Sequence, residues 1–315
     1  MEFIVEFKYT EGEDPFRDPE DPLMPKANNF RFEVDTKGAK KVRGQLSSYV
    51  SALLGSQFRL HTFVILVSGK YARLMFWDRS GATVTRRFIY AREGEAPKHF
   101  LSEFLWRYSQ ASPPQRGHDP TVRPASLEEV QKYGDAPKRL KQENLACHRE
   151  FRIMTIPDRD DSTKEHDFLI SSPSQHHTRS PFGRATRPMV ACDMCGNSVF
   201  IKDYWRAVVP GIEKEGDIYK ILEEHNVPHI APFGVGNDVR EYTTITHTLR
   251  NENWACWSSE MVPLRLYRMS MNVVGRSLTN FKSSREYVMA IADAMEGASP
   301  LYFLVEIPTC CPFSA

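Results

Sequence analysis

A lysine and a glutamate are the side chains whose positions most clearly suggest a shared chemical role. Lys202 ends the apolar run Val199-Phe200-Ile201, which predicts a strand, and Glu215 lies in a helix predicted over residues 211–225. A lysine that a strand carries into a core needs an acidic partner, because an unpaired buried charge is costly. Glu215 precedes the apolar stripe of that helix, so we predict that it pairs with Lys202, with Glu213 as the alternative.

Two other sets of side chains have spacings that occur in metal or acid–base sites. Cys192 and Cys195 have the spacing of half a zinc site, but no second pair follows at a suitable distance. His118-Asp119 and His176-His177 lie in polar segments rich in Pro and Ser, where solvated side chains are expected. We therefore predict no metal site and no catalytic residue among these groups.

Composition and charge narrow the classes of partner. The chain has 41 Lys and Arg against 40 Asp and Glu, a net charge of +1, so we expect no nucleic acid and no anionic membrane as partner. No window approaches the roughly 20 apolar residues of a membrane span, and the first residues do not resemble a signal peptide. We expect an intracellular protein, cytoplasmic or nuclear, whose six cysteines are reduced.

The elements that must position these residues follow from hydrophobic periodicity and turn chemistry. The first part of the chain predicts a strand, an amphipathic helix, three strands and a second helix, over 3–9, 43–56, 58–67, 71–77, 83–90 and 98–108. These elements form a mixed α/β domain over residues 1–110, and the predicted fold class of the chain is α+β.

The remainder of the chain predicts a linker followed by a second structured region. Residues 111–180 are rich in Pro, Ser, His and charge, so we expect irregular structure with a polar helix over 127–145. Strands and helices then return over 187–193, 198–204, 211–225, 242–249, 264–274 and 284–295.

Five sequence blocks carry a resemblance to one protein family. In chain order they are Trp77-Asp78-Arg79-Ser80-Gly81, Phe104-Leu105-Trp106-Arg107-Tyr108, Arg116-Gly117-His118-Asp119-Pro120-Thr121-Val122, Lys202-Asp203-Tyr204-Trp205-Arg206 and Val274-Gly275-Arg276-Ser277-Leu278. They resemble the successive signatures of the fungal-type protein kinases, within the protein kinase-like superfamily. The resemblance implies a kinase-like small lobe over 181–275 and the start of a large lobe over 276–298.

The resemblance also implies a nucleotide pocket. Lys202 would hold the α- and β-phosphates of ATP, with Glu215 as its partner. Gly183 would belong to the loop that covers the phosphates. Met271 would line the back of the adenine pocket, and backbone groups of Asn272, Val273 and Val274 would pair with the adenine edge. The family's activity is transfer of the ATP γ-phosphoryl group, with Mg²⁺, to protein Ser or Thr.

The chain departs from the family pattern in two places. The loop Gly183-Arg184-Ala185-Thr186-Arg187 keeps one glycine of G-x-G-x-x-G, which leaves Arg184 or Arg187 as another source of positive charge, although surface arginines are expected. No H-R-D catalytic loop and no D-F-G occur, and an apolar tail over 299–315 that looks unrelated follows. We therefore expect a chain truncated before the catalytic loop and inactive, or a pseudokinase-like interaction module whose partner is unknown.

The first domain carries a second, shorter resemblance. Glu6-Phe7-Lys8 on a strand, with Gln45 and Tyr49 on the next helix, resembles the E-x-K strand and Q-x-x-x-Y helix of restriction-endonuclease-like folds. In those folds carboxylates hold a magnesium ion that activates water. The metal-binding aspartate that precedes E-x-K there would lie upstream of Met1. We expect a degenerate, non-catalytic domain of that shape, or simply an amphipathic edge strand.

Overall fold

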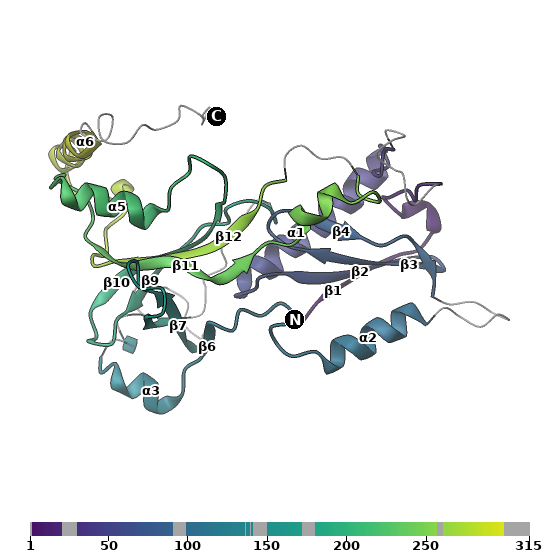
Figure 1. Ribbon diagram of the computed structural model, residues 1–315, viewed down its shortest axis with the longest axis horizontal. Coiled ribbons are helices and arrows are strands. Elements are labelled where there is room, and N and C mark those ends of the chain that lie inside the picture. Colours follow the sequence, from purple (N-terminus) through teal and green to yellow (C-terminus); the bar gives the residue numbers. More distant parts are fainter. Residues whose placement is uncertain are drawn as a thin grey trace.

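The chain folds around two β-sheets that lie one beyond the other along the molecule (Figure 1). The computed structural model describes residues 2–20, 30–90, 99–135, 137–138, 140, 150–171, 180–256 and 261–298. Its helices are α1 (Lys37–Ser56), α2 (Phe100–Gln110), α3 (Leu127–Lys132), α5 (Glu215–Glu224) and α6 (Ser284–Ala298), with the 3-10 turns η1 (Glu11–Glu13), η2 (Thr246–Asn251) and η3 (Leu278–Asn280). None of these described helices is long and apolar enough to cross a membrane.

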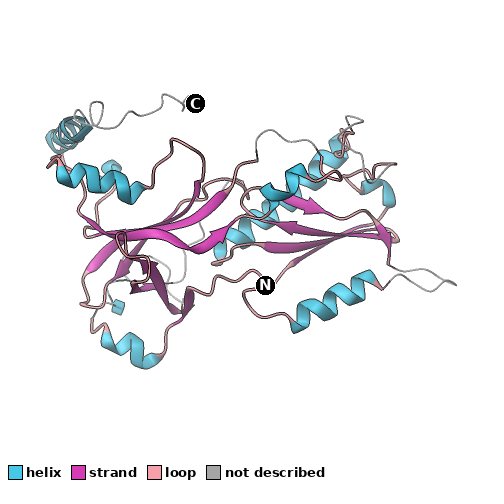
Figure 2. Cartoon of the chain, viewed as in Figure 1, coloured by secondary structure: helices cyan, strands magenta, loops and turns pink. Residues whose placement is uncertain are grey.

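The strands divide between a first sheet and a second sheet (Figure 2). The first sheet contains β1 (Ile4–Lys8), β2 (Thr62–Ser68), β3 (Tyr71–Trp77), β4 (Ala82–Val84) and β5 (Phe88–Ile89). The second contains β6 (Val122–Pro124), β7 (Phe151–Pro157), β8 (Glu165–Ser171), β9 (Arg187–Cys192), β10 (Ser198–Ala207), β11 (Phe233–Thr243) and β12 (Leu264–Met271). The mixed α+β class that the sequence predicts is confirmed.

In the first sheet, the alternation of side chains along β2 builds a core on each face. Val64 and Leu66 pack with α1, whereas Ile65 and Val67 pack with residues of α2 on the opposite face. β1 runs parallel to β2, and α1 provides the crossover connection that a parallel pair requires.

Helix α1 begins earlier than the sequence pattern indicates. Its buried stripe includes Leu46, Val50 and Leu54, as predicted, but the helix starts at Lys37 rather than Arg43. The additional residues extend the buried stripe by Ala39 and Val42, and the Thr36 hydroxyl caps the helix by accepting a hydrogen bond from the Ala39 amide at 3.2 Å.

The second sheet is antiparallel and has the strand order β11-β12-β10-β9-β8-β7-β6. Three of its strands come from residues 111–180, so the prediction of irregular structure there is wrong for those stretches. The polar start of β8, Glu165-His166-Asp167, hides its apolar stretch Phe168-Leu169-Ile170, which is buried. The polar helix is also shorter than the predicted 127–145, because α3 ends at Lys132.

Residues 242–249 were predicted as a strand, and this prediction is wrong. The strand there is β11, which ends at Thr243, and η2 follows it. Gly236 lies opposite Met269, and a Cβ at this glycine would be 2.6 Å from the Met269 Cβ, so the close approach of the two strands requires glycine.

A buried set of charged residues lies where the two sheets meet, and we call it the polar junction (Arg79, Asp119, Arg187, Asp203 and Arg268). Arg268 of β12 donates to Asp203 of β10 at 2.9 Å and to Asp119. Arg187 of β9 and Arg79, which follows β3, both donate to the Leu54 carbonyl near the C-terminal end of α1. A helix C-terminus attracts cations, so this end of α1 stabilises the two arginines.

Candidate nucleotide-binding site

Lys202 and Glu215 meet in the structure as the sequence predicts. The Lys202 ammonium lies 2.8 Å and 2.6 Å from the two carboxylate oxygens of Glu215, and each side chain is about a quarter exposed. Glu213, the alternative partner, forms no ion pair with Lys202 within the described residues. The result is a charged pair that stays within reach of solvent.

Backbone position explains why these two side chains meet. Lys202 lies in the middle of β10, and Glu215 is the first residue of α5, where the partial positive charge of the helix N-terminus favours a carboxylate. The next residue fixes the start of the helix on the sheet, because the Gly216 amide donates to the Tyr267 hydroxyl at 2.8 Å. A Cβ at Gly216 would be 2.6 Å from that hydroxyl oxygen, so glycine is required.

Tyr204 is a third member of the site that the sequence analysis did not single out. Its hydroxyl donates to a Glu215 carboxylate oxygen at 2.8 Å. Burial raises the pKa of Tyr204, and the nearby Glu215 carboxylate raises it further, so the phenol stays protonated and continues to donate. Residues two apart on a strand lie on the same face of the sheet, so the predicted strand places Tyr204 on the same face as Lys202. This spacing could have identified Tyr204 from the sequence.

The ring of Tyr204 also brings a second cation to the site. The Lys202 ammonium lies 4.9 Å from the ring centroid, and the Arg184 guanidinium lies 5.0 Å from it. Arg184 is exposed, in agreement with its prediction as a surface residue. Two positive groups therefore lie near one ring beside the carboxylate.

The loop that would cover phosphates has its backbone partly engaged. The Gly183 amide, at φ +86°, donates to the Arg79 carbonyl at 2.9 Å, and the Arg184 carbonyl accepts from the Trp205 amide at 2.8 Å. The Gly183 N–H is thus already used within the protein. Arg187 is buried in the polar junction, so the expectation that it lies on the surface is wrong, because the carbonyls at the end of α1 draw it inward.

The predicted adenine-binding segment follows β12. Met271 ends that strand, pairs in register with Phe200 and Phe233, and accepts from the Tyr219 hydroxyl at 3.9 Å through sulfur. The Asn272 amide donates to the Pro232 carbonyl at 2.9 Å. Within the described residues, the backbone groups of Val273 and Val274 form no hydrogen bond.

The structure also shows where the other candidate groups lie. Cys192 is buried and Cys195 is exposed, both as free thiols, and the described part of the chain has no cluster of three or more His, Cys, Asp and Glu suited to a metal. His118 lies 3.2 Å from Glu2 in an ion-pair geometry. The pair His176-His177 lies outside the described residues.

Comparison with known proteins decides the family. A sequence model of the fungal protein kinase family matches residues 28–307. The chain belongs to this family. The resemblance drawn from the five sequence blocks is therefore confirmed, and the matched range extends into residues 299–307, part of the tail that was expected to be unrelated. No curated protein and no solved structure matches the chain significantly.

Family membership shows that the chain is kinase-like, and kinases in general use ATP and Mg²⁺. The match covers the second sheet and the first sheet except β1, and it does not divide the chain into domains. The roles of Lys202, Glu215, Gly183 and the segment 271–274 in nucleotide binding stay predictions.

Proposed function

We propose that this kinase-family chain binds the phosphates of ATP at Lys202 and does not transfer the γ-phosphoryl group. The observation that carries the proposal is the two-oxygen contact between the Lys202 ammonium and Glu215. A lysine ammonium has three N–H donors, and two of them are directed at the Glu215 oxygens, so one remains for a phosphate oxygen. The exposed Arg184 guanidinium beside Tyr204 supplies further positive charge for the phosphates.

The proposed role without catalysis rests on the sequence motifs. In kinases the H-R-D-x-x-x-x-N loop provides the base and one magnesium ligand, and the D-F-G aspartate provides the other. These motifs do not occur in the 315 residues. We propose that the nucleotide acts as a stabilising ligand of a pseudokinase-like module that binds a protein partner, with the small lobe over 181–275 and the large lobe beginning at 276.

Thermal denaturation with and without Mg-ATP tests the proposal. A ligand that binds only the folded state raises the melting temperature, so we expect a rise for the wild type that Lys202→Ala abolishes. Lys220→Ala is the matched control, since Lys220 lies on α5 and pairs with the exposed Asp160 instead of Glu215. No rise for the wild type, or an equal rise for Lys202→Ala, would refute nucleotide binding at this site. Mg-dependent autophosphorylation would refute the absence of transfer.

A second candidate concerns the first domain, which we propose has a degenerate endonuclease-like shape. The supporting observation is that Lys8 lies 2.6 Å from Glu6 on the same strand and 2.9 Å from Gln45 on α1. The parallel order β1-α1-β2 supports the same shape. Tyr49 is exposed, and the described residues contain no acidic cluster suited to a metal, so we propose that this domain is non-catalytic. Mg²⁺-dependent cleavage of plasmid DNA, lost in Lys8→Ala, would contradict this assignment.

A further inference from the structure

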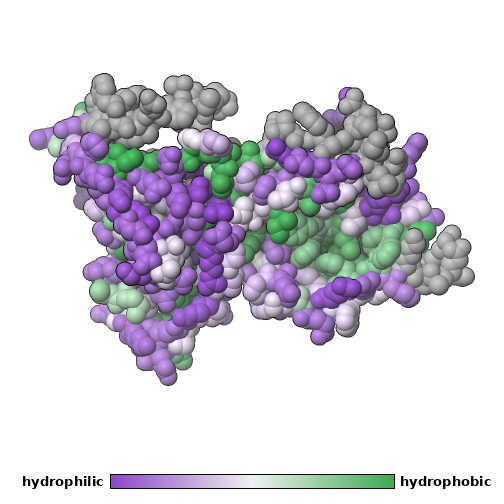
Figure 3. Space-filling model, viewed as in Figure 1, coloured by the Kyte–Doolittle hydropathy of each residue, from purple (hydrophilic) through white to green (hydrophobic). Residues whose placement is uncertain are grey.

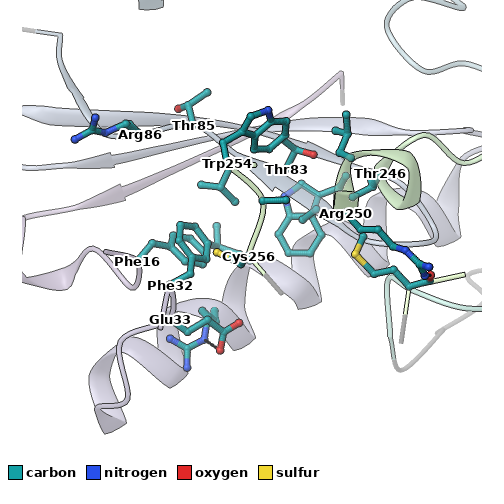
Figure 4. A pocket seen from close by; sticks show the side chains of 18 of the residues that line it. Phe16, Phe32, Glu33, Thr83, Thr85, Arg86, Thr246, Arg250, Trp254 and Cys256 are labelled. Atoms are coloured by element: carbon teal, nitrogen blue, oxygen red, sulfur yellow. Dashed lines mark hydrogen bonds and ion pairs between the residues drawn. The ribbon is translucent and has the colours of Figure 1, made fainter. Parts of the chain in front are cut away.

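The two edges of the first sheet differ in how the rest of the chain covers them. At the β4 edge the segment that contains η2 lies against the sheet, where the Asp78 carboxylate accepts from the amides of Ile245 and Thr246 at 2.6 Å and 2.8 Å. Figure 4 shows Thr246 and Trp254 near Thr83 of β4, around a cavity of about 830 Å³. Within the described residues, the strand at the other edge, β1, pairs with β2 alone.

The backbone of β1 directs alternate residues toward this second edge. The Lys8 carbonyl accepts from the Gly69 amide at 3.1 Å, so Lys8 directs its hydrogen-bonding groups toward β2. In a parallel pair, bonded residues alternate with residues whose N–H and C=O face away from the neighbouring strand. Val5 and Phe7 therefore face outward, and within the described residues their backbones form no hydrogen bond outside this ladder. Such an edge can pair with a further strand.

The side chains that accompany these outward groups are apolar. Val5, Phe7 and Tyr9 are 40%, 69% and 93% exposed, and they lie on the face opposite α1, because Ile4 packs with α1 and side chains alternate along a strand. Edge strands of natural proteins are usually protected by charged side chains, Pro or a bulge. In Figure 3, hydrophobic surface gathers over the first sheet, while much of the rest of this face is hydrophilic.

Two charged residues of β1 select the register in which a second copy of this strand fits. The Lys8 ammonium lies 2.6 Å from a Glu6 carboxylate oxygen, and both side chains are on the α1 face. An antiparallel pair of β1 strands with Phe7 opposite Phe7 places Glu6 of each copy opposite Lys8 of the other. The nearest registers that keep outward-facing residues paired place Glu6 opposite Glu6 or Lys8 opposite Lys8, and like charges in opposite positions are destabilising.

The same register also pairs the exposed apolar side chains. Val5 of each copy lies opposite Tyr9 of the other, and the two Phe7 rings lie opposite each other. Aromatic pairs and pairs of an aromatic with a β-branched residue stabilise neighbouring strands. The charged face and the apolar face of β1 therefore favour one and the same pairing.

From these observations we infer that the chain forms a homodimer in which β1 of one copy pairs antiparallel with β1 of a second copy. The two-fold axis passes between the two Phe7 residues, so the same surface serves both copies. The first sheets of the two copies form one continuous sheet across the dimer. This inference does not rest on the proposed nucleotide binding.

Sedimentation velocity of the full chain over a range of concentrations tests the dimer. We expect the wild type to shift from monomer to dimer as the concentration rises. Phe7→Glu should stay monomeric over that range, because it places two carboxylates opposite each other at the two-fold axis. Its circular dichroism should match that of the wild type, since Phe7 is exposed.

Val288→Glu is the matched control for an exposed apolar residue elsewhere. Val288 is 62% exposed on α6, which Figure 1 shows beside the second sheet and away from β1, so this variant should dimerise as the wild type does. A wild type that stays monomeric at every concentration would overturn the inference. Dimerisation of Phe7→Glu equal to that of the wild type, or loss of the dimer in Val288→Glu, would also overturn it.

Cysteine cross-linking tests the register independently of Phe7→Glu. Residues of a hydrogen-bonded antiparallel pair have Cα atoms about 5.5 Å apart, which suits a disulfide. Oxidised Phe7→Cys should therefore contain a disulfide between two copies of the peptide with position 7, which mass spectrometry without reduction identifies. Tyr9→Cys should form no such link with itself, because the two copies of position 9 lie roughly 14 Å apart along the paired strands.

A mixture of Val5→Cys and Tyr9→Cys should link position 5 of one variant to position 9 of the other. The wild type, treated in the same way, shows which disulfides come from the native cysteines. A self-link in Tyr9→Cys with none in Phe7→Cys would overturn the inferred pairing.

Discussion

The two faces of strand β10 carry the same kind of interaction with opposite consequences. On one face, Asp203 pairs with Arg268 in the polar junction, where the Arg268 side chain has no exposed surface. On the other face, Lys202 pairs with Glu215, and about a quarter of each side chain is exposed. Adjacent residues on a strand point to opposite faces, so one residue of separation places one pair in the interior and the other at the surface.

This difference teaches how burial decides the role of an ion pair. In the polar junction, Arg268 donates to Asp203 and Asp119, and also to the Thr121 hydroxyl at 2.6 Å, so its charge is compensated by groups within the protein. The Lys202 ammonium keeps one N–H that the Glu215 oxygens do not use. The buried set is suited to joining the two sheets, and the accessible pair is suited to binding a ligand.

The largest expected effect comes from removing the buried cation. Arg268→Met leaves Asp119 and Asp203 buried without their partner, so we expect the free energy of unfolding to fall by about 3–5 kcal/mol in urea denaturation. Arg265→Met is the control on the same strand, because Arg265 is partly exposed and pairs with the exposed Glu241, and because Asp238, 3.8 Å away, keeps its ion pair with Arg206 in this variant. Its expected loss is under about 1 kcal/mol. Equal losses of unfolding free energy in Arg268→Met and Arg265→Met would contradict the contrast between the buried and the accessible ion pairs.

The next expected effect is a pH dependence of stability that comes from Asp119 in the polar junction. Burial raises the pKa of Asp119, but the Arg268 guanidinium and the hydrogen bonds from Thr121 together lower it, and the net pKa lies below its ordinary value. A lowered folded-state pKa means that Asp119 contributes stability above its unfolded pKa of about 3.9, and this contribution is lost as the pH falls through the folded-state pKa.

We therefore expect the stability difference between the wild type and Arg268→Met to be largest near neutral pH. It should shrink as the pH falls, first as the unpaired Asp119 of the variant binds a proton and then as the pH passes through the lowered pKa of Asp119 in the wild type. Urea denaturation of both proteins at a series of pH values measures this difference, in which titrations common to the two proteins cancel. A difference that grows toward low pH would contradict the assigned role of Arg268.

The smallest expected effect on stability comes from the face of β10 that carries the Lys202–Glu215 pair. Lys202→Ala removes a pair that solvent screens, so we expect the free energy of unfolding to fall by at most about 1 kcal/mol in urea without nucleotide. Lys220→Ala should change it still less, because that lysine and its partner Asp160 are both largely exposed. A loss above about 2 kcal/mol for Lys202→Ala would assign the pair to the stability of the fold and weaken its proposed role as a ligand site.

Much of the fold and part of the site could be predicted from local patterns. The apolar stripe of α1 is periodic over its own residues, and the apolar run of β3 lies between two turn segments, so both elements are predicted well. The pairing of Lys202 with Glu215 follows from a strand and a helix that are close in sequence. Strand β8 was missed because its apolar centre is short and its pairing partner β7 is a separate polar-flanked segment.

The sequence by itself determined the family, which is recognised from blocks of residues in a fixed order. It also determined the Lys202–Glu215 pair, because the two residues are only 13 positions apart on a predicted strand and helix. Only the tertiary structure decided that Arg187 is buried and that residues 246–251 form a turn. The Thr246 amide binds a carboxylate 168 positions earlier in the chain, and Arg187 binds a carbonyl 133 positions earlier. Local periodicity carries no information about partners so distant, since the folded chain alone brings them together.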